Sequence, residues 1–217
     1  MIEDGAQSFG AQQHGRRSCN LSTVGTTSLF PSKPLGGYGD GGACFTNDAE
    51  LPSLVWRISR HGQSRRYFHT EVGVNGRIDT IQAAILLVNL EQFDAEAASR
   101  QQIGECYSQC FQVAGIAKTP FLAPGKTSVY AQYTIEVENL AAVQKALSAS
   151  GTPTAVHYLT LLCQQPALQG CVNRCRAGCA TPLEQRASER VMSLPMHPYL
   201  SPQDQDDVVA AVTAALC

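Results

Sequence analysis

The sequence predicts an α/β protein with an α+β C-terminal part, because strand-like and helix-like segments alternate along the chain. The first third is rich in Gly, Ser and Thr and carries short apolar runs, a pattern typical of buried strands joined by loops. From residue 77 the apolar residues recur at helical spacing. We therefore expect two domains, residues 1–88 and 89–217, with their boundary inside a long helix.

The first predicted elements are two strands, in LSTVGTTSLF (21–30) and GGACFTN (41–47), where short apolar runs are bounded by turn-forming residues. Residues 77–112 follow, with few helix breakers before Gly104. They predict one long helix or a pair of helices. The apolar positions at helical spacing are Ile78, Ile81, Ile85, Val88 and Phe93.

The last part of the chain predicts alternating strands and helices. VYAQYTIEVEN (129–139) alternates as a strand does, and LAAVQKALSASG (140–151) is helix-like and ends at Gly151. TAVHYLT (154–160) is expected to be another strand. SPQDQDDVVAAVTAALC (201–217) predicts a closing helix with Ser201 as its N-cap.

Composition favours a small molecule or a protein as partner. The 217 residues carry a formal net charge of -2, so a nucleic acid held by phosphate neutralisation is not expected. No run approaches the ~18 apolar residues of a membrane span. The first residues, MIEDGAQSFG, are acidic and polar where a signal peptide is basic and then apolar. We therefore expect a cytoplasmic protein without a membrane partner.

Nine cysteines are present, an odd number at irregular spacing, which favours reduced thiols over a disulfide framework. Cys171, Cys175 and Cys179 repeat every four residues and could share one helical face. Metal sites more often use CxxC pairs, and the Gly and Pro nearby disfavour a long helix. No metal site is therefore predicted, and the role of the three thiols stays open.

Lys33 lies in SLFPSKPLGGYGDGG, residues 28–42, between two prolines and ahead of five glycines. A solvated surface lysine is the ordinary interpretation. Here, however, Pro31 and Pro34 fix the backbone on either side, and glycines allow close backbone approach. A rigidly placed amine is what Schiff-base catalysis requires, so Lys33 is a candidate nucleophile.

Asp4 is a second candidate, in the segment EDGAQ that follows an apolar residue. At the end of a strand, its carboxylate could pair with the pyridinium nitrogen of pyridoxal 5'-phosphate (PLP) and keep the ring protonated. An exposed acid near the first residue is the alternative.

Four segments together resemble one known family. EDGAQSFGA, TTSLFPSKPLGGYGDGGACFTND, GVNGRIDTIQAAILL and SLPMHPYLS are similar to motifs of the DegT/DnrJ/EryC1/StrS family of PLP-dependent sugar aminotransferases. The resemblance covers essentially the whole chain. Within the family it is greatest to enzymes that aminate a UDP-linked 3-keto sugar acid. It implies a fold type I transferase, like aspartate aminotransferase.

Residue by residue, the resemblance implies a PLP site. Lys33 would form the Schiff base and serve as general base and acid for the proton shift. Asp4 would pair with the pyridinium nitrogen, Gln7 would lie near the ring, and Ser28 would bind the phosphate. Asn75 would reach the phosphate in the neighbouring subunit of a homodimer.

The resemblance also implies a substrate. Arg77 would face the sugar, where a guanidinium grips a carboxylate in two places. His157 and Tyr158 would line the same pocket. The reaction implied is a ping-pong transamination, commonly from glutamate, that delivers an amino group to a nucleotide-linked keto sugar for amino-sugar and cell-surface polysaccharide biosynthesis.

Simpler interpretations of these residues stay open. Ser28 could simply end a strand, Asn75 could supply a turn, and Arg77 could cap the long helix. His157 could be a histidine of the core.

The chain departs from the family pattern before EDGAQ. Family members carry a substantial segment there, with the first strands of the large domain, the turn that holds the phosphate and an aromatic residue that stacks on the ring. We therefore expect an incomplete large domain, residues 1–88, followed by a small α+β domain, residues 89–217. Two function classes follow: the active half of an aminotransferase, or a non-catalytic fragment of the PLP fold that folds or dimerises only.

Overall fold

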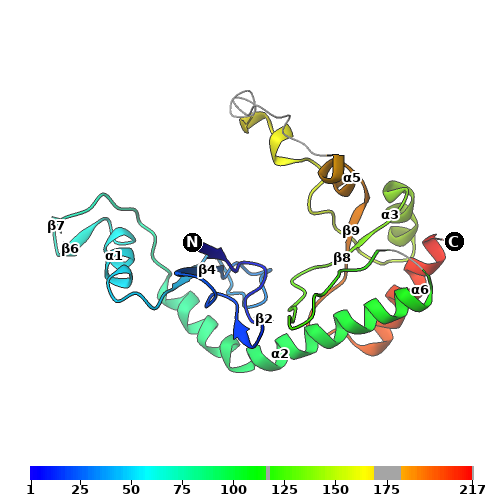
Figure 1. Cartoon of the computed structure of the whole chain (residues 1–217), viewed down its shortest axis with the longest axis horizontal. Coiled ribbons are helices and arrows are strands. Elements are labelled where there is room, and N and C mark those ends of the chain that lie inside the picture. The colour runs from blue at the N-terminus through cyan, green and yellow to red at the C-terminus, as the bar shows by residue number, and fades with distance from the viewer. Residues whose placement is uncertain (116–117, 169–181, 217) are drawn as a thin grey trace. The chain divides into compact units, whose positions relative to one another are not determined.

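The computed structural model describes residues 1–115, 118–168 and 182–216 (Figure 1). The chain forms two compact units: Met1–Gln101 with Leu122–Ala131, and Gln102–Phe121 with Gln132–Cys217. Helix α2, Thr80–Val113, contributes residues to both. The division by contacts falls within this helix, and the domain boundary after residue 88 stays a prediction.

The first unit contains short strands, one short helix and the beginning of α2. Its strands and helix are β1 (Ile2–Asp4), β2 (Gln12–Gln13), β3 (Arg16–Arg17), β4 (Val24–Ser28), β5 (Gly42–Phe45), α1 (Leu51–Ile58), β6 (Gln63–Arg65) and β7 (Phe68–His69). Three of the strands form a sheet in the order β1-β4-β5. The β1 strand runs parallel to β4, and β5 runs antiparallel to β4.

The core of this unit lies between α2 and the segments that follow β1 and β4. Leu29, Leu35, Leu86 and Phe93 are buried together, and the Phe9 ring stacks on Phe93 with centroids 5.4 Å apart. Full burial of one such side chain contributes about 1.5–3 kcal/mol. Leu86 and Phe93 are seven residues apart on α2, so both face the same side of the helix.

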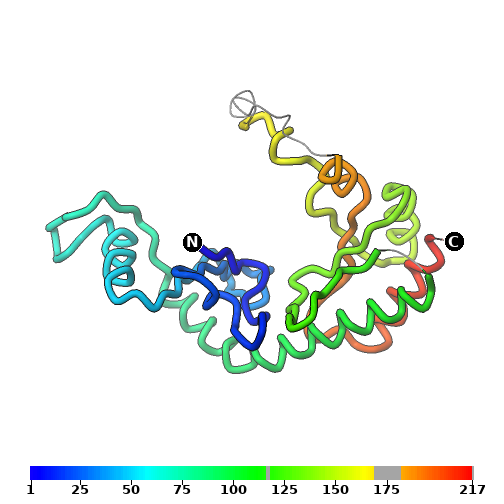
Figure 2. The backbone as a smooth tube through the Cα atoms, viewed as in Figure 1, coloured from blue at the N-terminus to red at the C-terminus, as the bar shows by residue number. Residues whose placement is uncertain are grey.

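Residues 51–79, which we call the arm, carry α1, β6 and β7. In Figure 2 this cyan segment extends away from the blue strands of the same unit. The first half of the arm, around Gly62, packs closely against the second half, around Gly73. Gly62 adopts φ +72°, and a Cβ on either glycine would collide with the backbone of the other half. The arm thus folds back on itself through backbone contacts, while none of the α1 side chains is buried.

The predicted long helix is confirmed as a single element, α2, which continues through Gly104 to Val113. Gly104 is buried within this helix. Packing of the apolar face therefore outweighs the low helix propensity of glycine, about 1 kcal/mol less favourable than alanine.

The second unit is built on a two-stranded antiparallel sheet of β8 and β9. Its core centres on aromatic rings, with Tyr107 and Phe111 of α2 stacked at 5.9 Å and Tyr133 of β8 at 5.0 Å from Tyr107. Burial raises the pKa of Tyr107, whose hydroxyl donates to the Pro195 carbonyl. The remaining elements are β8 (Tyr133–Glu136), α3 (Leu140–Ala149), η1 (Leu162–Gln164), η2 (Pro166–Leu168), α5 (Pro182–Arg190), β9 (Val191–Leu194) and α6 (Pro202–Leu216).

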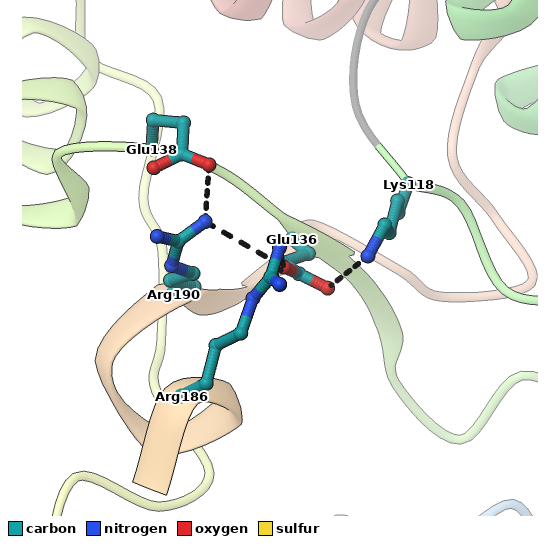
Figure 3. Close-up of polar contacts among 5 residues, drawn as sticks. All are labelled: Lys118, Glu136, Glu138, Arg186 and Arg190. Carbon is teal, nitrogen blue, oxygen red and sulfur yellow. Dashed lines mark hydrogen bonds and ion pairs between the residues drawn. The ribbon is translucent and has the colours of Figure 1, made fainter. Parts of the chain in front are cut away.

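Figure 3 shows an ion-pair network that ties α5 to β8 in this unit. The Glu136 carboxylate accepts from Arg186 at 3.1 Å and from Lys118 at 3.4 Å, and Arg190 pairs with Glu138. Partial burial acts to raise the pKa of Glu136, but the hydrogen bonds and charges of Lys118 and Arg186 outweigh it and hold the pKa below 4.5.

Most elements predicted from the sequence are confirmed. Strands β4, β5 and β8 lie within the predicted segments, and α3 and α6 match the predicted helices. Ser201 is the N-cap of α6, because its Oγ accepts from the Asp204 backbone N–H at 3.1 Å. None of the helices in the described part of the chain combines the length and apolar character that a membrane crossing needs.

The strand predicted for TAVHYLT is wrong. Only Ala155 pairs with a strand in this segment, through an isolated bridge to Ser193 of β9. Beyond it the segment turns, and His157 and Tyr158 are exposed. Alternation of residue types predicted a strand here, but the segment has only that single ladder contact to continue it.

Candidate active site

Asp4 and Ser28 end two neighbouring parallel strands. Asp4 is the last residue of β1 and pairs with Thr26 of β4, and Ser28 ends β4 two residues later. Carboxyl ends of parallel strands meet at one edge of a sheet, which is where ligands bind in α/β proteins. The register thus brings a carboxylate and a hydroxyl, both predicted from the sequence, to one sheet edge.

The turn after β1 fixes Asp4 and carries Gln7. Asp4 Oδ1 accepts from the Ala6 N–H at 3.0 Å, and the side chain is exposed. Gly5 donates its N–H to the Thr26 carbonyl at 2.7 Å, and a Cβ on Gly5 would collide with the Cys19 sulfur. Gln7 is exposed in the same turn, so it is free to face a ligand at this edge.

Glu3 holds β1 in place, a role that the sequence did not predict. Its carboxylate accepts from the Cys19 N–H at 2.7 Å, the Leu21 N–H at 3.0 Å and the Ser18 hydroxyl at 3.1 Å. Burial acts to raise the pKa of Glu3, but these three donors outweigh it and lower the pKa. The clamp ties residues 18–21 to the strand that presents Asp4.

Residues 28–41, which we call the lysine loop, form a tight turn after β4. Phe30 N–H donates to Ser28 Oγ at 3.3 Å, and Lys33 N–H donates to the Phe30 carbonyl at 2.9 Å. A Cβ on Gly36 would lie 2.6 Å from the Pro31 carbonyl oxygen, so close approach requires glycine there. The loop backbone is therefore constrained on both sides of Lys33.

The Lys33 side chain is half-buried, and the next two residues, Pro34 and Leu35, are buried. Among the described residues the Lys33 ammonium has no ion-pair or hydrogen-bond partner. An amine held by its backbone and unpaired at its tip is available for covalent chemistry.

Two amides of α2 hold the lysine loop, and sequence reasoning missed both. Gln82 Oε1 accepts from the Tyr38 N–H at 2.8 Å, and Asn89 Nδ2 donates to the Gly36 carbonyl at 2.9 Å. The two amides are seven residues apart and so lie on one helix face, with Leu86 between them in the core. The sequence did contain a signal for this contact: two amide residues seven positions apart, on either side of an apolar residue that faces the core.

Asn75 and Arg77 lie in the arm, exposed. Asn75 forms an isolated bridge with Arg60, which places it in extended chain rather than in a turn. Arg77 Nη1 donates to His61 Nε2 at 3.3 Å, and this requires an unprotonated Nε2. A guanidinium only donates, so the Arg77 side chain cannot accept from the free N–H groups at the start of α2.

His157 and Tyr158 belong to the second unit. His157 is exposed, and its Nδ1 lies 3.2 Å from the Ser193 hydroxyl, so the alternative of a core histidine is wrong. The Tyr158 side chain is also exposed and meets the His157 ring edge-on. Both side chains are accessible to a ligand.

The predicted thiol cluster of Cys171, Cys175 and Cys179 lies outside the described residues. Within residues 1–115, 118–168 and 182–216, no group of three or more His, Cys, Asp or Glu side chains could hold a metal ion.

Comparison with known proteins places this geometry in a family. Residues 1–213 match the model of the DegT/DnrJ/EryC1/StrS aminotransferase family. The chain belongs to the DegT/DnrJ/EryC1/StrS aminotransferase family. Members of this family are PLP-dependent, which confirms at the level of the family the cofactor predicted from the resemblance. The predicted fold type I architecture is confirmed by the solved structures described next.

A curated relative in Pseudomonas aeruginosa, a UDP-2-acetamido-2-deoxy-3-oxo-D-glucuronate aminotransferase, is 53% identical over 213 residues, 98% of this chain and 57% of the relative. The chain thus spans little more than half of that protein. A crystal structure of a family member from Brucella abortus superposes with a TM-score of 0.91 at 37% identity, covering 99% of this chain and 57% of the other. S. venezuelae DesV, solved with a ketimine intermediate, gives 0.92 at 30% identity, covering 98% and 57%.

The residues of the first unit fit the family's cofactor. PLP enzymes pair a lysine with an acid that faces the pyridinium nitrogen. Here Asp4 and Ser28 end neighbouring strands, and the loop that follows Ser28 carries the unpaired amine of Lys33. Ser28 Oγ accepts from the Phe30 N–H, so its own proton remains available for a phosphate oxygen.

Proposed function

We propose that this chain carries the lysine half of a PLP-dependent aminotransferase that adds an amino group to a nucleotide-linked keto sugar. The single observation that supports this best is the lysine loop, which holds an unpaired amine beside the parallel strand ends of Asp4 and Ser28. The 53% identity to the P. aeruginosa relative supports a UDP-linked 3-keto sugar acid as substrate.

Lys33 is proposed to hold the cofactor covalently and then to move a proton through its Nζ. Bound PLP supplies an electron sink that stabilises negative charge on the adjacent carbon. Both roles use the nitrogen lone pair of Lys33, and no ion pair among the described residues holds this side chain. The loop backbone limits where Nζ can go.

Asp4, Gln7 and Ser28 are proposed to orient the cofactor. The Asp4 carboxylate would hold a proton on the pyridinium nitrogen, and Glu3 would keep that carboxylate in place by anchoring β1. Gln7 shares the turn after Asp4 and can donate to the ring's 3-oxygen. Ser28 would donate its hydroxyl proton to the phosphate.

Arg77, His157 and Tyr158 are proposed to bind the sugar. Arg77 is oriented by His61, and its guanidinium can hold a carboxylate through two parallel hydrogen bonds. Glutamate is the proposed amino donor. The same proposal places the protein in the cytoplasm and in the synthesis of amino sugars for cell-surface polysaccharides.

The active form is proposed to be a homodimer in which Asn75 reaches the partner's cofactor phosphate. Asn75 lies in the arm, whose apolar side chains are largely exposed: Val72 is 98% and Trp56 is 52% accessible. Exposed apolar side chains gathered in one segment favour burial against a protein surface, and a second copy supplies the matching site.

A fragment that folds or dimerises without catalysis is the second candidate. The observation that favours it is coverage, because the chain spans 57% of the P. aeruginosa relative. One experiment separates the two. In a chimera, this chain replaces the matching 213-residue segment of that relative. Turnover of a UDP-linked 3-keto sugar acid with glutamate by the chimera supports the aminotransferase. A folded, dimeric chimera without turnover supports the fragment.

A further inference from the structure

The arm contains a basic pocket of about 290 Å³. Most of the residues that line it have no role in the proposed function. It is formed within one unit, by the end of α1, the β6–β7 hairpin and Arg77 near the end of the arm. We refer to it as the arginine pocket. The side chains that line it are Trp56, Arg60, His61, Gln63, Arg65, Arg66 and Arg77.

The lining is basic without a compensating acid. Four of the seven residues are arginines, and none of the described lining side chains is acidic. Beside the pocket, Arg57 is neutralised by Glu71 at 3.2 Å, so that pair adds no free charge. Four guanidiniums held together without carboxylates repel one another, and a bound anion would relieve that repulsion.

Three of the arginines are held by aromatic rings. The guanidinium carbon of Arg60 lies 4.5 Å from the Trp56 ring centroid, that of Arg65 4.7 Å from Phe68 and that of Arg66 4.9 Å from Tyr67. Cation–π contact occupies the flat face of a guanidinium and leaves its N–H edge available. The rings therefore preorganise the guanidiniums. Arg66 Nη2 also donates to the Tyr67 hydroxyl at 3.0 Å, and the remaining N–H groups of Arg66 have no partner among the described residues.

The size and chemistry of the pocket select the ligand. Small-molecule sites are typically ~300–1,000 Å³, so this pocket suits one compact group better than a whole nucleotide sugar. Guanidinium edges match the paired oxygens of phosphate groups. A diphosphate offers several such oxygens in a small volume.

Arg77 links the pocket to the proposed substrate. It lines the pocket and is also proposed to hold the sugar carboxylate. In a nucleotide sugar the diphosphate is bonded directly to the sugar, so the groups that bind each must be neighbours. We infer that Arg60, Arg65 and Arg66 bind the diphosphate of the nucleotide-linked substrate; the link to the sugar rests on the proposed function.

The test is isothermal titration calorimetry on the 217-residue chain, with UDP, inorganic pyrophosphate, uridine and PLP as probes. UDP and pyrophosphate should bind, and uridine should not. The variant pair Arg65→Ala and Arg66→Ala should weaken UDP binding about tenfold to a hundredfold, because charge-assisted hydrogen bonds are lost. Raising the salt concentration should weaken it further.

The chain offers a matched control. Arg16 and Arg17 form β3, also a pair of adjacent exposed arginines in a short hairpin of the same unit. Changing both to alanine removes the same charge outside the pocket and should leave UDP affinity within about twofold. Replacing Arg65 and Arg66 by lysine keeps the charge, and should still cost affinity because the forked donors are lost.

Three results would overturn the inference. These are no binding of UDP or pyrophosphate to a folded chain, equal loss of affinity in the two alanine pairs, or binding of PLP but not of pyrophosphate. Each outcome is independent of turnover. A chimera that binds UDP through the arginine pocket but transfers no amino group would overturn the proposed function and leave this inference standing.

Discussion

In the lysine loop, backbone hydrogen bonds, a core leucine and two amides of α2 hold one amine in place. In the arm, backbone hydrogen bonds and the Arg57–Glu71 ion pair join the two halves, and the arginines of the pocket, most of the aromatic rings and Asn75 stay exposed. Both regions belong to one unit, and both carry residues predicted for the site. The difference indicates that contacts within the unit hold the lysine loop in place, whereas the arm is the surface that we propose a ligand or a second subunit completes.

Removal of the Lys33 amine should have the largest effect. In the chimera, Lys33→Ala should lower turnover by about 10⁴-fold or more, because both the covalent attachment and the proton transfer are lost. Lys126→Ala is the control, since this exposed lysine lies in the same unit. The measurement is the steady-state rate of each variant. Equal rates for the two variants would show that Lys33 is not the catalytic lysine.

The arm should act on the partner's site. Mixing chimeras that carry Lys33→Ala with chimeras that carry Asn75→Ala should restore about a quarter of the sites, because half of the dimers are mixed and one site in each is intact. Activity is measured after subunit exchange has been verified by mass spectrometry. Verified mixed dimers without activity would contradict a shared site.

The rigidity of the lysine loop should depend on α2. Gln82→Ala removes the acceptor for the Tyr38 N–H and should lower kcat about tenfold, while the stability loss is about 1 kcal/mol. Gln82→Glu keeps an acceptor and should restore much of kcat. Gln92→Ala, at an exposed position of the same helix, is the control. A kcat that Gln82→Ala leaves unchanged would show that the loop does not need this contact.

The smallest expected effect is the loss, at low pH, of the stability that Glu3 contributes. Because the pKa of Glu3 is lowered in the folded chain, its contribution to stability is present above its ordinary value of 4.5 and is lost as pH falls through the lowered value. Glu3→Gln should cost about 1 kcal/mol at pH 7, since one acceptor oxygen is lost. Urea unfolding at pH 7 and pH 3 should show the difference between variant and parent shrinking in acid. A constant difference would contradict the clamp.

Local patterns predicted much of this structure, and tertiary contacts decided the rest. The spacing of apolar residues predicted α2 over most of its length, and Ser201 predicted the start of α6. Both predictions succeeded because each signal depends on residues close together in the sequence. TAVHYLT failed because only Ala155 finds a strand partner. The arm was missed because its hairpin is short and its glycines act through contacts between residues 58–62 and 71–76.

The residues of the candidate site also fall into those that local sequence predicted and those that depend on tertiary contacts. The lysine loop could be found from its prolines and glycines, which restrict the backbone locally. Gln82, Asn89 and Glu3 could not be assigned, because their partners lie 15 to 53 residues away in the chain. The arginine pocket was missed for a different reason. Each ring lies within four residues of its arginine, but only the fold of the arm gathers the four arginines around one pocket.

The claim that Lys33 alone holds the cofactor is tested most directly by trapping. The chimera is incubated with PLP, reduced with borohydride and digested, and the peptides that carry the cofactor are identified by mass spectrometry. The account predicts label on the peptide that contains Lys33 and none in the Lys33→Ala variant. Label on Lys118, Lys126 or Lys145 with Lys33 unmodified would contradict it.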